Sequence, residues 1–254
     1  MGVSELIESI SNMIKKIEEQ FATTSFKNLN VEITRSGLEE LWKLVPTLFE
    51  WELEDIEIIG VNRTFKLIFK DAPPIKALQA SRIQYEALQL VHKNGVNVVS
   101  PISIDEKTNW QFVEWIDGEV YRLVLNKLEV LHSIKPSLWF KLGELLGKVN
   151  SIPWGKEGMR LGVFDALWWN FVITKDEEVY LIDTKKFIFH IYPEKYIFWT
   201  ILFHEYILPE QLLSFVNGYL SSIDIKEDLA PSGFSMMEAT KLFANGLYGK
   251  LARK

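Results

Sequence analysis

Apolar residues recur along the chain in two rhythms, one typical of helices and one typical of strands. Spacings of three and four residues predict amphipathic helices, and alternation at every second residue predicts half-buried strands. The predicted helices lie at about 4–21, 37–49, 75–94, 121–133, 136–151 and much of 195–252. The predicted strands are NLNVEITRS, 56–60, 64–70, the pair NVVSPISID and WQFVEWI, and a hairpin of WNFVIT and EVYLIDT.

The two kinds of element are distributed unevenly. The first half is rich in strands with one helix inserted, whereas the part after residue 119 is mainly helical and carries one small hairpin. This order favours an α+β chain in two lobes that join near residues 115–119.

Composition and charge exclude several classes of function. The 254 residues carry a formal net charge of −6 without a dense run of Lys or Arg, so bulk charge gives no strong sign of a nucleic-acid partner. No stretch approaches the length of a membrane span, and we expect no direct membrane contact. The absence of cysteine excludes disulfides and thiolate metal sites, and it fits a cytoplasmic protein.

Three oxygen-bearing side chains are concentrated in the segment LGVFDALWWNFVITKDEEVYLIDTKKF. Asn170 follows Asp165 after five residues, and Asp183 comes thirteen residues later. Because Asn170 begins one strand of the predicted hairpin and Asp183 ends the other, both side chains should reach one point. Carboxylate and amide oxygens suit a hard cation such as Mg²⁺, which takes one or two carboxylates plus phosphates.

This pattern, D-x4-N and then an apolar strand ending in I-D, resembles the catalytic and metal-binding loops of protein-kinase-like enzymes. It is most similar to aminoglycoside and choline phosphotransferases, and RIO-type and lipopolysaccharide-core kinases share the style. The resemblance implies a bilobal fold, with an antiparallel sheet and one αC-type helix in the N-lobe and a mainly helical C-lobe. It also implies that ATP and Mg²⁺ are cofactors, that Asn170 and Asp183 bind the metal, and that Asp165 orients or deprotonates the hydroxyl of an acceptor.

Upstream segments match the same enzymes in the expected order. FKLIFK is similar to the strand that carries the nucleotide lysine, which gives Lys70 as the first choice and Lys66 as the second. SRIQYEALQLVHKNGVNVVSPI resembles the helix and strand that follow, so Glu86 is the expected ionic partner of that lysine. QFVEWIDGE resembles the hinge, where backbone groups of Glu114 and Ile116 are expected to contact adenine.

The resemblance spans about residues 52–220 and implies three parts. These are an N-terminal helical extension at 1–50, a kinase-like N-lobe at 51–116 and a kinase-like helical C-lobe at 117–254. The unmatched residues 1–50 are a candidate docking segment for a protein partner. The hydroxyl-bearing acceptor stays open between a small molecule and a protein.

Two features depart from the pattern of these enzymes. Val163 stands where the catalytic loop usually has a histidine, and Gly60 stands alone where the phosphate loop has several glycines. Asn62 or Arg63 would then supply donors to the phosphates. The departures keep a second hypothesis open, a pseudokinase that binds a nucleotide or a protein without turnover, and a third, a helical scaffold.

Structural roles compete with three of these assignments. Asp183 alternatively caps a turn after a buried strand, Glu86 alternatively lies on a solvated helix face, and Lys70 alternatively is an exposed lysine at a strand end. An acid that ends the apolar run VYLI is costly unless it is paired, which favours a functional role for Asp183.

Overall fold

The chain folds into two compact units. The computed structural model describes residues 31–60, 63–120, 132–155, 158–166, 168–194, 196–197 and 207–224. Unit 1 comprises Met1–Gln79 and Ile102–Trp115, and unit 2 comprises Ala80–Pro101 and Ile116–Lys254. The predicted helix at 4–21 and nearly all of the one at 121–133 lie outside the described residues.

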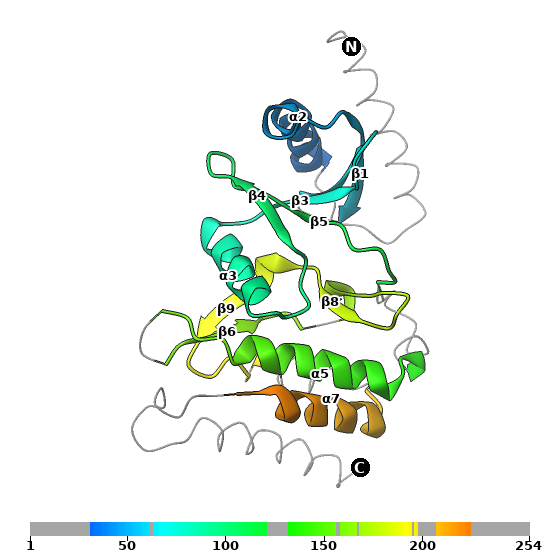
Figure 1. The fold of residues 1–254 in the computed structure, drawn as a ribbon, viewed down its shortest axis with the longest axis vertical. Helices are drawn as coiled ribbons and strands as arrows, with labels where there is room; N and C mark the ends of the chain where they lie inside the picture. The colour runs from blue at the N-terminus through cyan, green and yellow to red at the C-terminus, as the bar shows by residue number, and fades with distance from the viewer. Residues whose placement is uncertain are drawn as a thin grey trace. The chain divides into compact units, whose positions relative to one another are not determined.

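Unit 1 is built on a five-stranded sheet with the spatial order β1-β2-β3-β5-β4 (Figure 1). Its strands are β1 (Leu53–Gly60), β2 (Thr64–Phe69), β3 (Ile75–Gln79), β4 (Pro101–Asp105) and β5 (Trp110–Glu114). The β1–β2, β2–β3 and β3–β5 pairs are antiparallel. The structure confirms four predicted strands. They are those at 56–60 and 64–70 and those in NVVSPISID and WQFVEWI, which contain β4 and β5.

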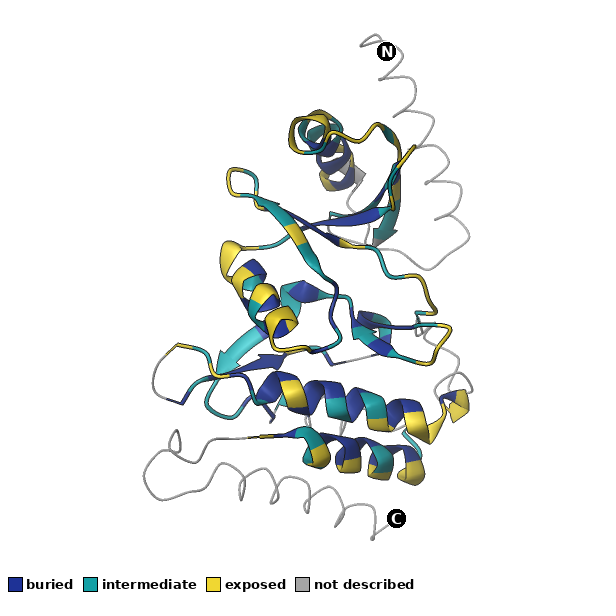
Figure 2. Cartoon of the chain, in the orientation of Figure 1, coloured by how far each residue is buried: buried dark blue, intermediate teal, exposed yellow. Residues whose placement is uncertain are grey.

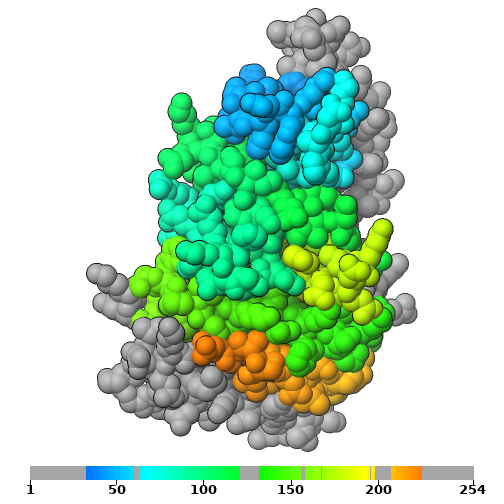
Figure 3. Space-filling view, in the orientation of Figure 1, coloured from blue at the N-terminus to red at the C-terminus, as the bar shows by residue number. Residues whose placement is uncertain are grey.

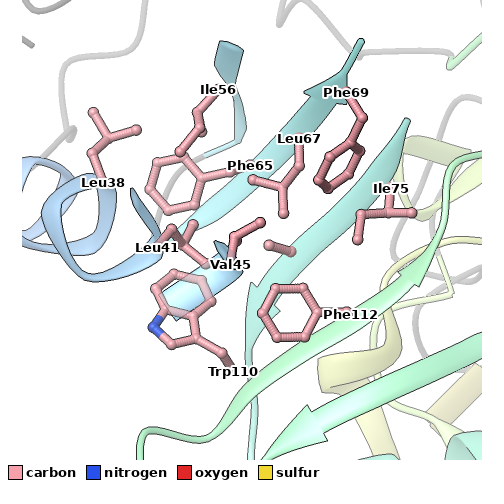
Figure 4. Packing of buried hydrophobic residues seen from close by; sticks show 11 residues of the cluster. Leu38, Leu41, Val45, Ile56, Phe65, Leu67, Phe69, Ile75, Trp110 and Phe112 are labelled. Carbon is pink, nitrogen blue, oxygen red and sulfur yellow. The ribbon is translucent and has the colours of Figure 1, made fainter. Parts of the chain in front are cut away.

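One face of this sheet is covered by helix α2 (Val31–Leu48). Leu38, Leu41 and Val45 recur at helical spacing and pack on inward-facing residues of four strands (Figure 4). Those residues are Ile56, Phe65, Leu67, Phe69, Ile75, Ala77, Trp110 and Phe112. Each Leu, Ile, Val or Phe side chain in this set contributes about 1.5–3 kcal/mol when it is fully buried, so the contact between α2 and the sheet stabilises unit 1 substantially.

Two predicted elements of unit 1 are wrong in part. Residues 31–36, predicted as part of a strand, form the first turns of α2, so Ser36 lies inside the helix and does not cap it. The predicted helix at 75–94 is divided, because Ile75–Gln79 is β3 and the helix α3 (Arg82–Lys93) begins only after Ser81. Side chains of Ile75–Gln79 point alternately to the two faces of the sheet, which is the period of a strand and not of a helix.

Unit 2 contains α3 together with two long helices, α5 (Pro136–Asn150) and α7 (Pro209–Ser222), which lie side by side (Figure 1). A Cβ on Gly143 would collide with the carbonyl of Phe215, and one on Gly218 would collide with the carbonyl of Phe140. The two helices therefore meet backbone against backbone. Figure 2 shows buried and exposed residues on opposite sides of α5, and Figure 3 shows the outer side chains of α7 in orange.

A buried polar network joins α5 and α7 to the strands of unit 2. The Arg160 guanidinium forms an ion pair with Glu194 at 2.8 Å, and both side chains are almost completely inaccessible to solvent. Arg160 also donates to the carbonyl of Asn150, whose side chain donates to the Tyr219 hydroxyl at 2.7 Å. Burial raises the pKa of the Tyr219 phenol well above its ordinary value. The network fixes four segments of chain to one another.

Two short strand pairs complete unit 2. β7 (Phe171–Ile173) and β8 (Val179–Leu181) form the predicted hairpin. β6 (Arg160–Val163) and β9 (Phe187–His190) form a second antiparallel pair that the sequence did not predict. Among the described residues, no helix combines the length and the apolar character that crossing a membrane requires.

Candidate functional site

The two strand pairs of unit 2 enclose the segment that carries the three oxygen donors. The β6–β9 ladder ends at Val163 and Phe187, after which the Phe164 N–H donates to the carbonyl of Lys186 at 2.8 Å. The β7–β8 ladder begins at Phe171 and Leu181. Residues 164–166 and 168–170 on one side, and residues 182–186 on the other, are therefore held beside each other at both ends. We call these two stretches the carboxylate loop.

Asn170 and Asp183 are neighbours in the carboxylate loop. The carbonyl of Asn170 accepts hydrogen bonds from the N–H groups of Ile182 at 2.9 Å and Asp183 at 3.4 Å. The side chain of Asn170 is buried, and its Nδ2 donates to the carbonyl of Asp165 at 2.5 Å. This bond fixes the orientation of the Asn170 side-chain amide and leaves its oxygen, Oδ1, available as a ligand for a hard cation. The structure thus brings Asp165, Asn170 and Asp183 into one small region of the chain.

Asp165 presents a half-buried carboxylate between β6 and the 3₁₀ turn η1 (Trp168–Asn170). Trp169 donates its indole N–H to Oδ2 of Asp165 at 3.4 Å. Trp168 is buried and packs edge-to-face on Trp139 with the ring centroids 5.1 Å apart. The first of the two adjacent tryptophans is therefore a core residue, whereas the second contacts the catalytic candidate.

Asp183 caps the 3₁₀ turn η2 (Thr184–Lys186) through its Oδ1, which accepts from the Lys185 N–H at 3.1 Å. A carboxylate has two oxygens with about four acceptor positions, so capping leaves capacity for a cation ligand. Burial lowers the pKa of the Lys185 ammonium, and the nearby Asp183 carboxylate partly opposes that shift. A cation and an acid thus stand side by side at this end of the carboxylate loop.

In unit 1, the sheet face opposite α2 carries two lysines on adjacent strands. Lys66 of β2 stands directly across from Lys76 of β3, and side chains opposite each other share one face. Lys76 is only 8% exposed. The Lys66 ammonium lies 3.5 Å from Oε2 of Glu57 and 4.8 Å from the ring centroid of Trp115. We call Glu57, Lys66, Lys76 and Trp115 the lysine face.

Lys70, the first choice for the nucleotide lysine, lies outside the lysine face. It follows the last residue of β2, is exposed, and its Nζ lies 3.1 and 3.2 Å from the two carboxylate oxygens of Glu52. FKLIFK therefore forms the second strand, and the third strand carries Lys76. The sequence analysis missed Lys76 because it assigned Ile75–Gln79 to a helix. IKALQ is buried along nearly its whole length and its burial does not alternate, so its pairing with β2 and β5 is what identifies the strand.

Glu86 lies on the exposed side of α3, where its carboxylate accepts from Arg82 at 2.9 Å. Gln84, a half-buried residue two positions earlier on α3, makes two hydrogen bonds to the backbone of Phe187. Its Nε2 donates to the carbonyl at 2.9 Å, and its Oε1 accepts from the N–H at 3.0 Å. Gln84 thus joins α3 to the first residue of β9, directly after the carboxylate loop.

The other predicted nucleotide contacts lie at strand ends. Gly60 is the last residue of β1 and pairs with Thr64. Glu114 is the exposed last residue of β5, and Ile116 is a half-buried residue at the start of the second segment of unit 2. Asn62 lies outside the described residues.

Arg63, proposed above as a substitute donor for phosphates, faces α2 instead. Its guanidinium donates to Glu40, Ser36 and Gln79, each at 3.2 Å. Its backbone has a φ of 59°, in the left-handed region that non-glycine residues rarely adopt. Arg63, directly before β2, is therefore joined to helix α2.

Comparison with known proteins identifies similar folds. The macrolide 2′-phosphotransferase of Brachybacterium faecium has a TM-score of 0.53 at 9% identity, over 85% of this chain and 94% of that one. Spectinomycin phosphotransferase APH(9)-Ia, solved with ADP and spectinomycin, has a TM-score of 0.53 at 12% identity, over 85% and 89%. A choline/ethanolamine kinase family protein from Mesorhizobium loti has the same TM-score at 12% identity, over 86% of each chain.

No protein-family model and no curated protein matches the sequence. The likeness is therefore one of fold. The chain has an α+β fold similar to the folds of this macrolide phosphotransferase, this spectinomycin phosphotransferase and this choline/ethanolamine kinase family protein.

Proposed function

We propose that this protein is a phosphotransferase that moves the γ-phosphoryl group of ATP to a hydroxyl-bearing acceptor. The observation that carries the proposal is the carboxylate loop, in which two strand pairs hold Asp165, Asn170 and Asp183 together. The similar folds include a phosphotransferase solved with ADP, which supports a nucleotide as the ligand.

Asn170 and Asp183 are the proposed ligands of Mg²⁺. Their donors are an amide oxygen and a carboxylate, which match the preference of Mg²⁺ for one or two protein oxygens together with phosphate oxygens. The described residues hold no group of three or more His, Asp or Glu side chains arranged for a metal, so a site completed by phosphates fits the donor set better than an all-protein cage. When bound, Mg²⁺ would neutralise charge on the transferred phosphoryl group.

Asp165 is the proposed catalytic residue. Its carboxylate would accept a hydrogen bond from the acceptor hydroxyl, orient the attacking oxygen and take its proton as the new bond forms. Trp169 and Asn170 hold Asp165 from its side chain and its carbonyl, respectively. Proteins catalyse phosphoryl transfer mainly by positioning the reactants and stabilising charge. The fixed position of Asp165 would therefore be its main contribution to catalysis.

Lys76 replaces Lys70 as the proposed contact to the nucleotide phosphates. A cation shielded from water attracts an anion more strongly than an exposed one, and Lys76 is buried whereas Lys70 is exposed and paired with Glu52. Glu86 remains the predicted ionic partner of the nucleotide lysine. Backbone groups of Glu114 and Ile116 remain the predicted contacts to adenine. Gly60 remains the predicted glycine of the loop that contacts the phosphates.

The test is ATP turnover, measured as phosphate release and as transfer of labelled γ-phosphate to a panel of hydroxyl compounds and proteins. Asp165→Ala should lower turnover by about 10²–10⁴-fold, the usual contribution of a general base. A matched control is Lys107→Met, an exposed change in the turn between β4 and β5. Equal turnover in wild type and Asp165→Ala would contradict the proposed role.

A second candidate is a protein that binds a nucleotide without turnover. It is favoured by Val163, a buried strand residue where similar enzymes carry a histidine, and by the lone Gly60. In that case ATP with Mg²⁺ would raise the melting temperature of the wild type, and no phosphate would be released.

A further inference from the structure

The two faces of the unit 1 sheet differ in what they can bind. One is covered by α2 and its apolar contacts. The other is the lysine face. Lys66 and Lys76 are directly opposite on antiparallel strands, which places their Cβ atoms about 4.5–5.5 Å apart. Two lysines so placed can contact one anion together.

Lys66 is held in place weakly enough to turn toward a ligand. Its ion pair with Glu57 is long, at 3.5 Å, and the Glu57 side chain is half exposed. Water therefore screens this pair in part, from the side of Glu57. The other contact of Lys66 is the ring of Trp115, the last residue of unit 1 before Ile116. Trp115 follows Glu114, a predicted adenine contact at the end of β5, so its ring reaches across β3 to Lys66.

The stretch directly before Lys66 contains a single glycine, Gly60. Glycine-rich turns bind phosphates through backbone N–H groups, and here the connection after β1 contains Gly60 followed by Val61, Asn62 and Arg63. The Arg63 side chain is engaged by α2. Lys66, on the strand that follows, offers a side-chain cation in place of those backbone donors.

We propose that Lys66 is a second phosphate-binding residue, and that Lys66 and Lys76 together hold the polyphosphate of a nucleoside diphosphate or triphosphate. This inference rests on the proposed function, since it requires that the protein bind a nucleotide. It adds that recognition depends on the number of phosphates. Lys66 replaces by side-chain charge what a glycine-rich turn supplies by backbone donors.

The experiment is calorimetric titration of wild type, Lys66→Met, Lys66→Arg and the control Lys107→Met with adenosine, AMP, ADP and ATP. Lys66→Met should weaken ADP and ATP by about tenfold, which corresponds to one charge-assisted contact. It should leave adenosine unchanged and weaken AMP by less than ADP. Lys66→Arg should keep most of the affinity, and Lys107→Met should match the wild type.

An equal loss for adenosine and ATP would overturn the inference, because Lys66 would then act on the base or on Trp115. Unchanged ATP affinity in Lys66→Met would overturn it too. A wild type that binds no nucleotide would instead refute the proposed function.

Should Lys66→Met fail to fold, the wild type and Lys66→Arg still decide by competition with inorganic tripolyphosphate. Displacement of ADP by tripolyphosphate from both, weakening steeply with salt, is the expected result. The absence of displacement from the wild type would contradict a polyphosphate site.

Discussion

The carboxylate loop of unit 2 and the lysine face of unit 1 are assembled in opposite ways. The three residues of the loop lie within nineteen positions of one another, from Asp165 to Asp183, and adjacent strand pairs hold them. The four residues of the lysine face are spread between positions 57 and 115, on three strands and directly after β5. The register between β2 and β3 brings its two lysines together. A site of the first kind can be recognised from spacing along the chain, whereas a site of the second kind requires the correct strand pairing.

The largest expected effect concerns the scaffold of the carboxylate loop. Arg160→Met leaves Glu194 as a buried charge without its partner, so it should lower the free energy of unfolding by about 3–5 kcal/mol. Urea denaturation measures this loss. Lys148→Met, which removes an exposed pair with Glu144, should change the free energy of unfolding by less than about 0.5 kcal/mol. Similar losses in both variants would contradict a buried network as the support of the loop.

The next effect decides between the two candidate nucleotide lysines. Lys76→Met should weaken ATP binding by roughly 10–100-fold, the value of a desolvated charged hydrogen bond. Lys70→Met should change it by less than about twofold, since an exposed pair contributes little. Titration with ATP and Mg²⁺ compares them. The reverse order of losses would return the nucleotide lysine to the end of β2.

A smaller loss is expected where α5 and α7 meet. Gly218→Ala forces a methyl group against the Phe140 carbonyl and should cost about 1–3 kcal/mol of unfolding free energy, as overpacking usually does. Gly95→Ala is a control of a different kind, because its Cβ meets open space while its φ of 72° is strained for alanine. If Gly218→Ala is as stable as the wild type, the two helices do not touch backbone to backbone.

The smallest effect is a difference in alkaline stability. The pKa of Tyr219 is raised by burial, so above its ordinary value of 10.0 the unfolded chain loses this proton before the folded chain does. The folded state then binds more protons, and stability falls as pH rises. Tyr219→Phe should therefore lose stability less steeply above pH 10 than the wild type in thermal denaturation. Identical slopes would show that the phenol is not buried in solution.

The fold class and the carboxylate loop could be predicted from the sequence because their signals are local. The hairpin between Asn170 and Asp183 follows from apolar alternation and one turn, and α5 follows from a helical stripe. β6 and β9 were missed because four-residue strands more than twenty residues apart carry no local signal of their pairing. Lys76 was missed because IKALQ joins smoothly onto the apolar pattern of α3, and only the neighbouring strands fix it as β3.

Arg63 shows a second limit of sequence interpretation. A cation beside a glycine in a turn indicates a phosphate contact, yet its partners Ser36 and Glu40 lie on a helix more than twenty residues earlier. Nothing in the turn itself predicts that choice. The same holds for Glu86, whose apolar neighbours placed it near the buried side of α3, although the exposed Arg82 is its partner.

The most direct measurement is the Mg²⁺ dependence of ADP binding in wild type, Asn170→Ala and Asp183→Ala, by calorimetric titration with and without the metal. The account predicts that Mg²⁺ strengthens ADP binding to the wild type, and that this gain disappears in both variants while metal-free binding stays. If the gain persists in Asp183→Ala, or if the wild type binds ADP equally well without Mg²⁺, then the carboxylate loop is not the metal site of a phosphotransferase.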